Sequence, residues 1–118
     1  RPDLPVIAGE GAEDRVQEAL TLFAAARPLA PRLRGMVLIG ERRWDLVLDR
    51  DQRVMLPEAG AVAALNRVIE LDRAEDLLAR DVAVVDMRND YRPTIRLGAA
   101  AMATLRGEAL DETKVNGQ

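Results

Sequence analysis

The sequence predicts an α+β domain, in which two main helices pack on one side of a largely antiparallel sheet. One observation is the order of the periodic segments, which runs strand, helix, three strands, helix, two strands. A second is the shortness of the turns between the three central strands, which favours antiparallel neighbours. A third is the composition, 48% apolar and 31% charged over 118 residues, which suits one core with a solvated surface.

The first half of the chain supplies a strand, a helix and a three-stranded meander. Residues 4–8 are a short apolar strand. Positions 12–27 carry apolar side chains at three- and four-residue steps, which predicts a helix that Pro28 ends. Three strands are expected over 33–39, 44–49 and 53–56. Trp44 alternates in phase with the leucines of its strand, so it is expected in the core rather than as an exposed stacking platform.

The second half supplies the other helix and a hairpin. The second helix follows Pro57, and its apolar side chains run from Val62 to Ile69. Asp72 is expected to cap a further short helix. The two strands of the hairpin lie within residues 82–97, at or near the edge of the sheet. Residues 1–97 are expected to form a single domain, and residues 98–118 a C-terminal tail that is partly helical or disordered.

The hairpin has a predicted register and two predicted faces. If residue 88 pairs with residue 91, then 84 meets 95 and 86 meets 93. The expected buried face carries Val82, Val84, Ile95 and Leu97. At the turn end of that face lie Asp86, Arg88 and Tyr91. The opposite face carries Arg92, Thr94 and Arg96.

The residues that usually carry chemistry are scarce. The chain has no His, Cys or Ser, so nucleophilic catalysis and thiolate or imidazole metal sites are not expected. No calcium-loop pattern occurs, although a site of carboxylates alone stays open. No cofactor and no metal are predicted. The net charge of -3 gives no reason to expect a nucleic-acid surface.

Membrane segments are also not predicted. No apolar run approaches the roughly 18 residues that span a bilayer. The chain begins with Arg1, so it is expected to be a piece of a longer protein.

Spacing leaves three charged groups with two interpretations each. Asp86 and Arg88 share a strand face, and a structural ion pair is favoured over a functional one. Asp45 and Asp49 are expected to face outward, as ordinary surface acids rather than as an acid–base pair. The arginines would form a positive patch if the first turn meets the last hairpin, but a solvated surface explains them equally well; they are Arg42, Arg43, Arg88, Arg92 and Arg96.

Three segments together resemble the FtsQ/DivIB family of bacterial cell-division proteins, in its alphaproteobacterial form. Residues 4–12 read Leu-Pro-Val-Ile-Ala-Gly-Glu-Gly-Ala, and residues 42–48 read Arg-Arg-Trp-Asp-Leu-Val-Leu. Residues 84–88 read Val-Val-Asp-Met-Arg and are followed by Arg-Pro-Thr-Ile-Arg-Leu at 92–97. Each motif is similar to one in the family's periplasmic β domain, in the same order.

The resemblance implies a non-enzymatic scaffold. Such a domain binds the periplasmic parts of FtsB and FtsL, among other division proteins, during assembly of the complex that controls septal peptidoglycan synthesis. The parent protein would carry a short cytoplasmic tail, one transmembrane helix in the inner membrane and a further periplasmic domain. The domain itself would lie in the periplasm at the division septum. Two alternatives are a self-associating periplasmic module and an Asp/Glu-dependent cell-wall enzyme.

The resemblance also implies a binding site. In the family a partner segment adds a strand to the last strand of the domain. The implied partner-binding residues are Arg88, Asn89, Tyr91, Arg92, Thr94, Ile95, Arg96 and Leu97, with Arg88 contacting an acidic residue of FtsB. Structural roles are expected for Asp86, Trp44 and Pro93. Pro93 departs from the family's pattern and has no N–H to donate to an added strand.

Overall fold

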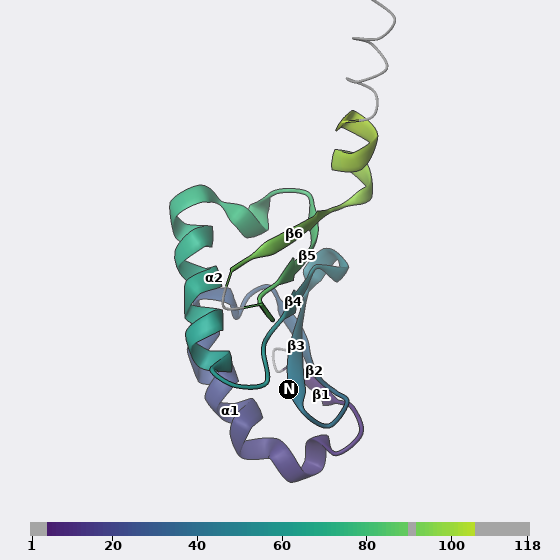
Figure 1. The fold of residues 1–118 in the computed structure, drawn as a ribbon. Coiled ribbons are helices and arrows are strands. Elements are labelled where there is room, and N and C mark those ends of the chain that lie inside the picture. The colour runs from purple at the N-terminus through teal and green to yellow at the C-terminus, as the bar shows by residue number, and fades with distance from the viewer. Residues whose placement is uncertain (1–4, 90–91, 106–118) are drawn as a thin grey trace, which may run out of the picture.

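The computed structural model describes residues 5–89 and 92–105, which form a six-stranded mixed sheet with two main helices (Figure 1). The strands are β1 (Val6–Ala8), β2 (Leu33–Ile39), β3 (Arg43–Leu48), β4 (Arg53–Met55), β5 (Val82–Asp86) and β6 (Thr94–Leu97). The main helices are α1 (Val16–Ala25) and α2 (Ala61–Glu75). Short 3-10 helices are η1 (Ala12–Arg15), η2 (Arg27–Leu29), η3 (Asp49–Asp51) and η4 (Leu77–Ala79).

The strands lie in the sheet in the order of the sequence, from β1 to β6. The pairs β2–β3, β3–β4 and β5–β6 are antiparallel, so the predicted meander and hairpin are confirmed. The pairs β1–β2 and β4–β5 are parallel, so the prediction of a largely antiparallel sheet is wrong. The reason is that each of these connections contains a helix. A helical crossover returns the chain to the same end of the sheet, and the next strand therefore runs in the same direction.

The two main helices lie together on one side of the sheet, as Figure 1 shows. Their apolar faces meet a row of fully buried side chains at the centre of the sheet. This row crosses four neighbouring strands through Met36, Leu46, Val54 and Val85. Trp44 is 2% exposed and belongs to the same core, which confirms its predicted position. α1 and α2 leave the opposite side of the sheet uncovered (Figure 1).

Asp72 is not the N-cap of the short helix η4, as predicted: it lies inside α2, and the N-cap position is taken by Asp76, which makes no side-chain cap hydrogen bond. Asp72 nevertheless holds the connection after α2. The Asp72 carboxylate accepts a hydrogen bond of 2.8 Å from the N–H of Leu78, which lies in η4. Leu77 and Leu78 are both buried, so this hydrogen bond holds η4 where two apolar side chains enter the core before β5 begins.

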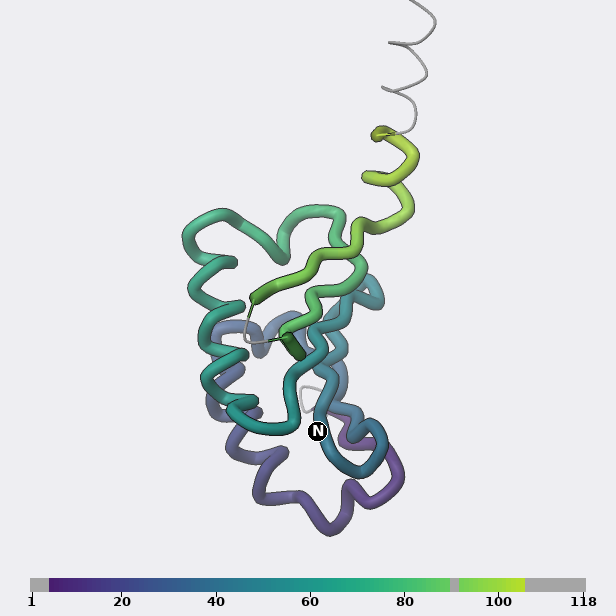
Figure 2. The backbone as a smooth tube through the Cα atoms, in the orientation of Figure 1, coloured from purple at the N-terminus to yellow at the C-terminus, as the bar shows by residue number. Residues whose placement is uncertain are grey.

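Residues 99–105 are helical and leave the end of β6 in a direction away from the sheet (Figure 2). Asp81 joins this helix to the start of β5, because its carboxylate accepts the N–H of Ala101 and its carbonyl accepts the N–H of Gly98. Nothing in the fold tests the predicted boundary between a domain and a tail, which stays a prediction. Among the described residues, no helix has the length and apolar character needed to cross a bilayer.

Candidate functional site

The strand β6 forms one edge of the sheet. It pairs with β5 on one side, and no described strand pairs with its other side. Ile95, in the middle of the strand, is 37% exposed although it is a large apolar residue. An edge strand with unpaired main-chain groups is a ready template for another strand. The predicted position of the last hairpin at the sheet edge is therefore confirmed.

The register of the hairpin differs from the prediction by one residue. Asp86 pairs with Thr94, Val85 with Ile95 and Val84 with Arg96. An irregularity between Val82 and Val84 then brings Val82 opposite Leu97, where the prediction had placed it. The cause is an extra residue in β5, which a β-bulge accommodates and which the apolar pattern alone does not reveal.

This register changes the faces of the hairpin. Val84 lies on the side of the sheet away from the helices, so the predicted buried face of Val82, Val84, Ile95 and Leu97 is wrong at Val84. Val85 takes its place opposite Ile95 on the helix side. The prediction that Thr94 and Arg96 point away from Asp86 and Arg88 is also wrong, because all four line one groove.

The groove lies on the uncovered side of the sheet, beside β6, and has a volume of about 630 Å³. Its positive side chains come from β3, β4, β6 and the turn after β5. The lining residues are Ile39, Arg43, Asp45, Arg53, Met55, Val84, Asp86, Arg88, Thr94 and Arg96. The four arginines outnumber the two aspartates, so the groove has a net positive charge. We call it the arginine groove.

Asp86 and Arg88 form a two-pronged ion pair at the turn end of the arginine groove. The Nε of Arg88 donates to Asp86 Oδ1 at 2.9 Å, and Nη2 donates to Oδ2 at 2.7 Å. These side-chain bonds hold the pKa of the Asp86 carboxyl below its ordinary value; partial burial opposes the shift, and the main-chain N–H of Arg88 adds to it. In return, Asp86 raises the pKa of Arg88. Arg88 still exposes 48% of its side chain, so an outside carboxylate can reach it.

Asp45 forms a second charged cluster at the floor of the arginine groove. It faces away from the helices as expected, but its side chain is only 3% exposed, because Arg43 and Arg53 cover it. Arg53 Nη1 donates to Asp45 Oδ2 at 2.8 Å. The two arginines compensate the buried carboxylate and are themselves fixed in place.

The alternative of a positive patch is thus partly realised. Arg43, Arg88 and Arg96 come together in the arginine groove, whereas Arg42 does not line it. Neither Arg43 nor Arg53 was among the predicted binding residues. Strand alternation could have identified them, because Arg43 and Asp45 share one face of β3, and Met55, opposite Asp45, shares a face with Arg53.

The remaining predicted residues lie around the turn. Asn89 and Arg92 are exposed, and the N–H of Arg92 donates to the carbonyl of Asn89 at 3.0 Å. Pro93 and Leu97 are half-buried. Tyr91 lies outside the described residues.

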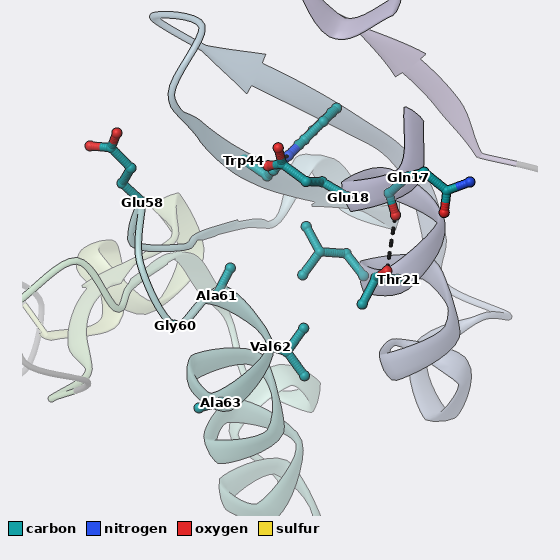
Figure 3. Close-up of a pocket in the computed structure, with 10 residues that line it drawn as sticks. Gln17, Glu18, Thr21, Trp44, Glu58, Gly60, Ala61, Val62 and Ala63 are labelled. Carbon is teal, nitrogen blue, oxygen red and sulfur yellow. Dashed lines mark hydrogen bonds between the residues drawn. The ribbon is translucent and has the colours of Figure 1, made fainter. Parts of the chain in front are cut away.

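A separate cleft of about 410 Å³ lies between α1 and the start of α2 (Figure 3). Trp44 and Leu22 contribute apolar surface, and two carboxylates, Glu18 and Glu58, lie on its walls. Glu18 accepts hydrogen bonds from the Trp44 indole N–H at 3.3 Å and from Arg15 Nη1 at 2.8 Å, so it is already engaged. The carboxyls of Asp49 and Asp86 lie outside this cleft, and their neighbouring arginines lower their pKa values. A general acid needs a raised pKa, so neither carboxyl has the shift that acid catalysis requires. The cleft therefore gives the enzyme alternative little support.

Metal chemistry is also without a candidate in the part of the chain that the structure describes. No group of three or more His, Cys, Asp or Glu residues there could hold a metal ion. The feature with the clearest chemical character is the arginine groove beside the free edge of β6.

Comparison with known proteins gives a consistent result. The sequence profile described as "Cell division protein FtsQ/DivIB, C-terminal" matches residues 1–88. A cell division protein FtsQ from Roseobacter litoralis is 63% identical over 97 residues, covering 82% of this chain and 33% of that protein. One from Ketogulonicigenium vulgare is 58% identical over 106 residues, covering 90% and 35%. One from Bartonella bacilliformis is 38% identical over 117 residues, covering 96% and 37%. The chain thus spans about a third of the length of these relatives.

Proposed function

Because the chain belongs to the FtsQ/DivIB family of cell division proteins, we propose that it is a non-enzymatic docking module of the division complex. Its partners are the periplasmic segments of FtsB and FtsL. One of these segments adds a strand to β6, and the charged side chains beside β6 select it. In this role the chain helps to assemble the complex that controls septal peptidoglycan synthesis.

The observation that carries the proposal is the free edge of β6 beside the arginine groove. Strand addition supplies affinity through main-chain hydrogen bonds, whereas neighbouring side chains supply specificity. A segment with an acidic residue near the turn would meet Arg88, whose guanidinium is half-exposed and held in a fixed orientation by Asp86. Charge complementarity of this kind discriminates between partners and speeds their encounter.

The proposal includes a place in the cell. The parent protein is anchored in the inner membrane by one transmembrane helix outside this chain, and the docking module lies in the periplasm at the septum.

Calorimetry of the chain with a synthetic periplasmic FtsB segment tests the proposal. We expect binding, and about tenfold weaker binding with Arg88→Glu, because the substitution replaces an attraction by a repulsion. Arg67→Glu makes the same charge change on the exposed side of α2 and should leave the affinity unchanged. Thermal unfolding of both variants checks that the fold survives. Equal affinities for the unsubstituted chain and a folded Arg88→Glu variant would show that Arg88 does not contribute to binding.

The free edge also favours one second candidate, in which β6 pairs with β6 of another copy. Sedimentation of the chain at rising concentration separates the two. A chain that stays monomeric at high concentration would exclude self-association. If the chain dimerises and the FtsB segment does not compete with the dimer, that segment binds somewhere other than β6.

A further inference from the structure

The direction of the main-chain groups of β6 follows from two hydrogen bonds at its neighbours. The N–H of Met87 donates to the carbonyl of Met55 at 2.9 Å, so Met87 is turned toward β4. Asp86, one position earlier, is therefore turned toward β6, where Thr94 is its partner. At the other end of β6, the N–H of Gly98 donates to the carbonyl of Asp81 at 2.9 Å and is thus also turned inward.

The hydrogen bonds at the two ends of β6 give the same alternation of main-chain direction along the strand. Thr94, Arg96 and Gly98 turn their main-chain groups toward β5. Ile95 and Leu97 turn theirs toward the free edge. Pro93 has the same outward phase, but it has no N–H, so only its carbonyl is available. The free edge therefore offers complete donor and acceptor pairs at Ile95 and Leu97, and its bonding is interrupted at Pro93.

The side chains also alternate along β6, so residues 95 and 97 share one face of the sheet and residues 94 and 96 share the other. Ile95 continues the buried row that runs through Val54 and Val85 on the helix side of the sheet. Arg96 lies on the other side, in the arginine groove, next to Val84 and close to Arg53. Residues directly opposite one another on neighbouring strands point to the same face, whether the strands are parallel or antiparallel.

We propose that the β6 edge selects an extended segment with an acidic residue between two apolar residues. The apolar residues lie opposite Ile95 and Leu97, bond to their main chains and extend the buried row; the acidic residue lies opposite Arg96 and enters the arginine groove. The inference rests on the proposed strand addition and specifies its register. The net positive charge of the groove and the 37% exposure of Ile95 are the two features that this pattern satisfies together.

Amide hydrogen exchange of the chain, followed by NMR, tests the alternation without any partner. Thr94 and Arg96 should exchange slowly, because their N–H groups bond within the sheet. Ile95 and Leu97 should exchange at least about tenfold faster, because theirs face solvent. Slow exchange at Ile95 together with fast exchange at Arg96 would overturn the register. When the FtsB segment is added, Ile95 and Leu97 should become protected while Thr94 and Arg96 change little.

Two synthetic peptides of equal composition test the selection. In the first, Glu stands between two Val residues; in the second, Glu is moved by one position, which sends its side chain to the helix face. We expect the first to bind about tenfold more tightly, because one misplaced apolar contact is worth about one factor of ten. Arg96→Glu should abolish that preference and Arg67→Glu should keep it.

The outcomes separate the inference from the function. Equal binding of the two peptides, or no binding of either while the FtsB segment binds and protects Ile95, would overturn the proposed pattern and leave strand addition intact. No protection of β6 by the FtsB segment would overturn strand addition itself.

Discussion

The side-chain amide of Gln52 donates a hydrogen bond of 2.9 Å to the main-chain carbonyl of Val82. Gln52 follows η3, whereas Val82 begins β5, and α2 lies between them in the sequence. The side-chain carbonyl of Gln52 in turn accepts from Arg32 Nη2 at 2.9 Å. Arg32 also donates to the carbonyl of Leu78 and to Asp49. This network fixes the start of the strand on which β6 is paired.

Replacing Gln52 by Ala should destabilise the fold. Gln52 is 2% exposed, so the substitution leaves the Val82 carbonyl without its partner in a buried place. We expect the free energy of unfolding to fall by about 1–3 kcal/mol, measured by urea denaturation. Gln17→Ala, on the exposed side of α1, should change it little. A Gln52→Ala protein as stable as the parent would mean that water replaces the amide without cost.

Gly9 and Gly40 both have positive φ, at 108° and 61°, but their surroundings differ. A Cβ on Gly9 would overlap the main-chain oxygen of Leu38, whereas a Cβ on Gly40 meets nothing within 4 Å. Gly9→Ala should therefore lower the free energy of unfolding by at least about 1 kcal/mol more than Gly40→Ala, which carries only the conformational strain. Chemical denaturation of the two variants side by side makes the comparison. Equal losses would show that β1 moves away freely.

The core contact between α2 and the sheet can be measured at Leu65. Leu65 is fully buried, whereas Val62, one turn earlier on the same helix, is 36% exposed. Leu65→Ala should lower the free energy of unfolding by about 2–5 kcal/mol, because it leaves a cavity in the core. Val62→Ala should lower it by less than about 1 kcal/mol. Similar losses at the two positions would argue against the described orientation of α2.

The ion pair between Asp86 and Arg88, at the turn end of the arginine groove, predicts that the stability of the fold depends on pH. Arg88 lowers the pKa of Asp86 in the folded state below the unfolded value of about 3.9. The stability that the pair contributes is therefore present above about pH 4 and is lost as the pH falls through the folded pKa. An NMR titration of the Asp86 carboxyl should give a midpoint below the ordinary value. In Arg88→Gln the midpoint should move back up, and in Arg67→Gln it should not move; an ordinary midpoint in the unsubstituted chain would rule out the pair.

Much of the fold could be predicted because its signals are local. The helix periods, the proline at the end of the first helix and the alternation around Trp44 each depend on neighbours within a few residues. The family resemblance carried by three short segments is confirmed by the profile match over residues 1–88. What local patterns miss is the relative direction of strands joined by helices, since that direction depends on how the helix crosses the sheet and not on neighbouring residues.

The arginine groove shows the same limit. Arg43, Arg53 and Arg96 belong to three strands, and only the sheet order brings them together. Arg96 lies on the predicted face of β6, but the β5 side chains that share this face depend on one extra residue in β5, because a shift by one position sends a side chain to the opposite face.

The sequence by itself determined the composition of the core, the order of the elements and the family to which the chain belongs. Tertiary structure alone decided the parallel strand pairs and the bulge in β5. It also decided that Ile95 and Leu97 are the residues of β6 whose main-chain groups point to the free edge of the sheet. The physical reason is that the apolar periodicity of a helix or strand depends on neighbouring residues, whereas strand register depends on hydrogen bonds between segments that can lie far apart in the chain.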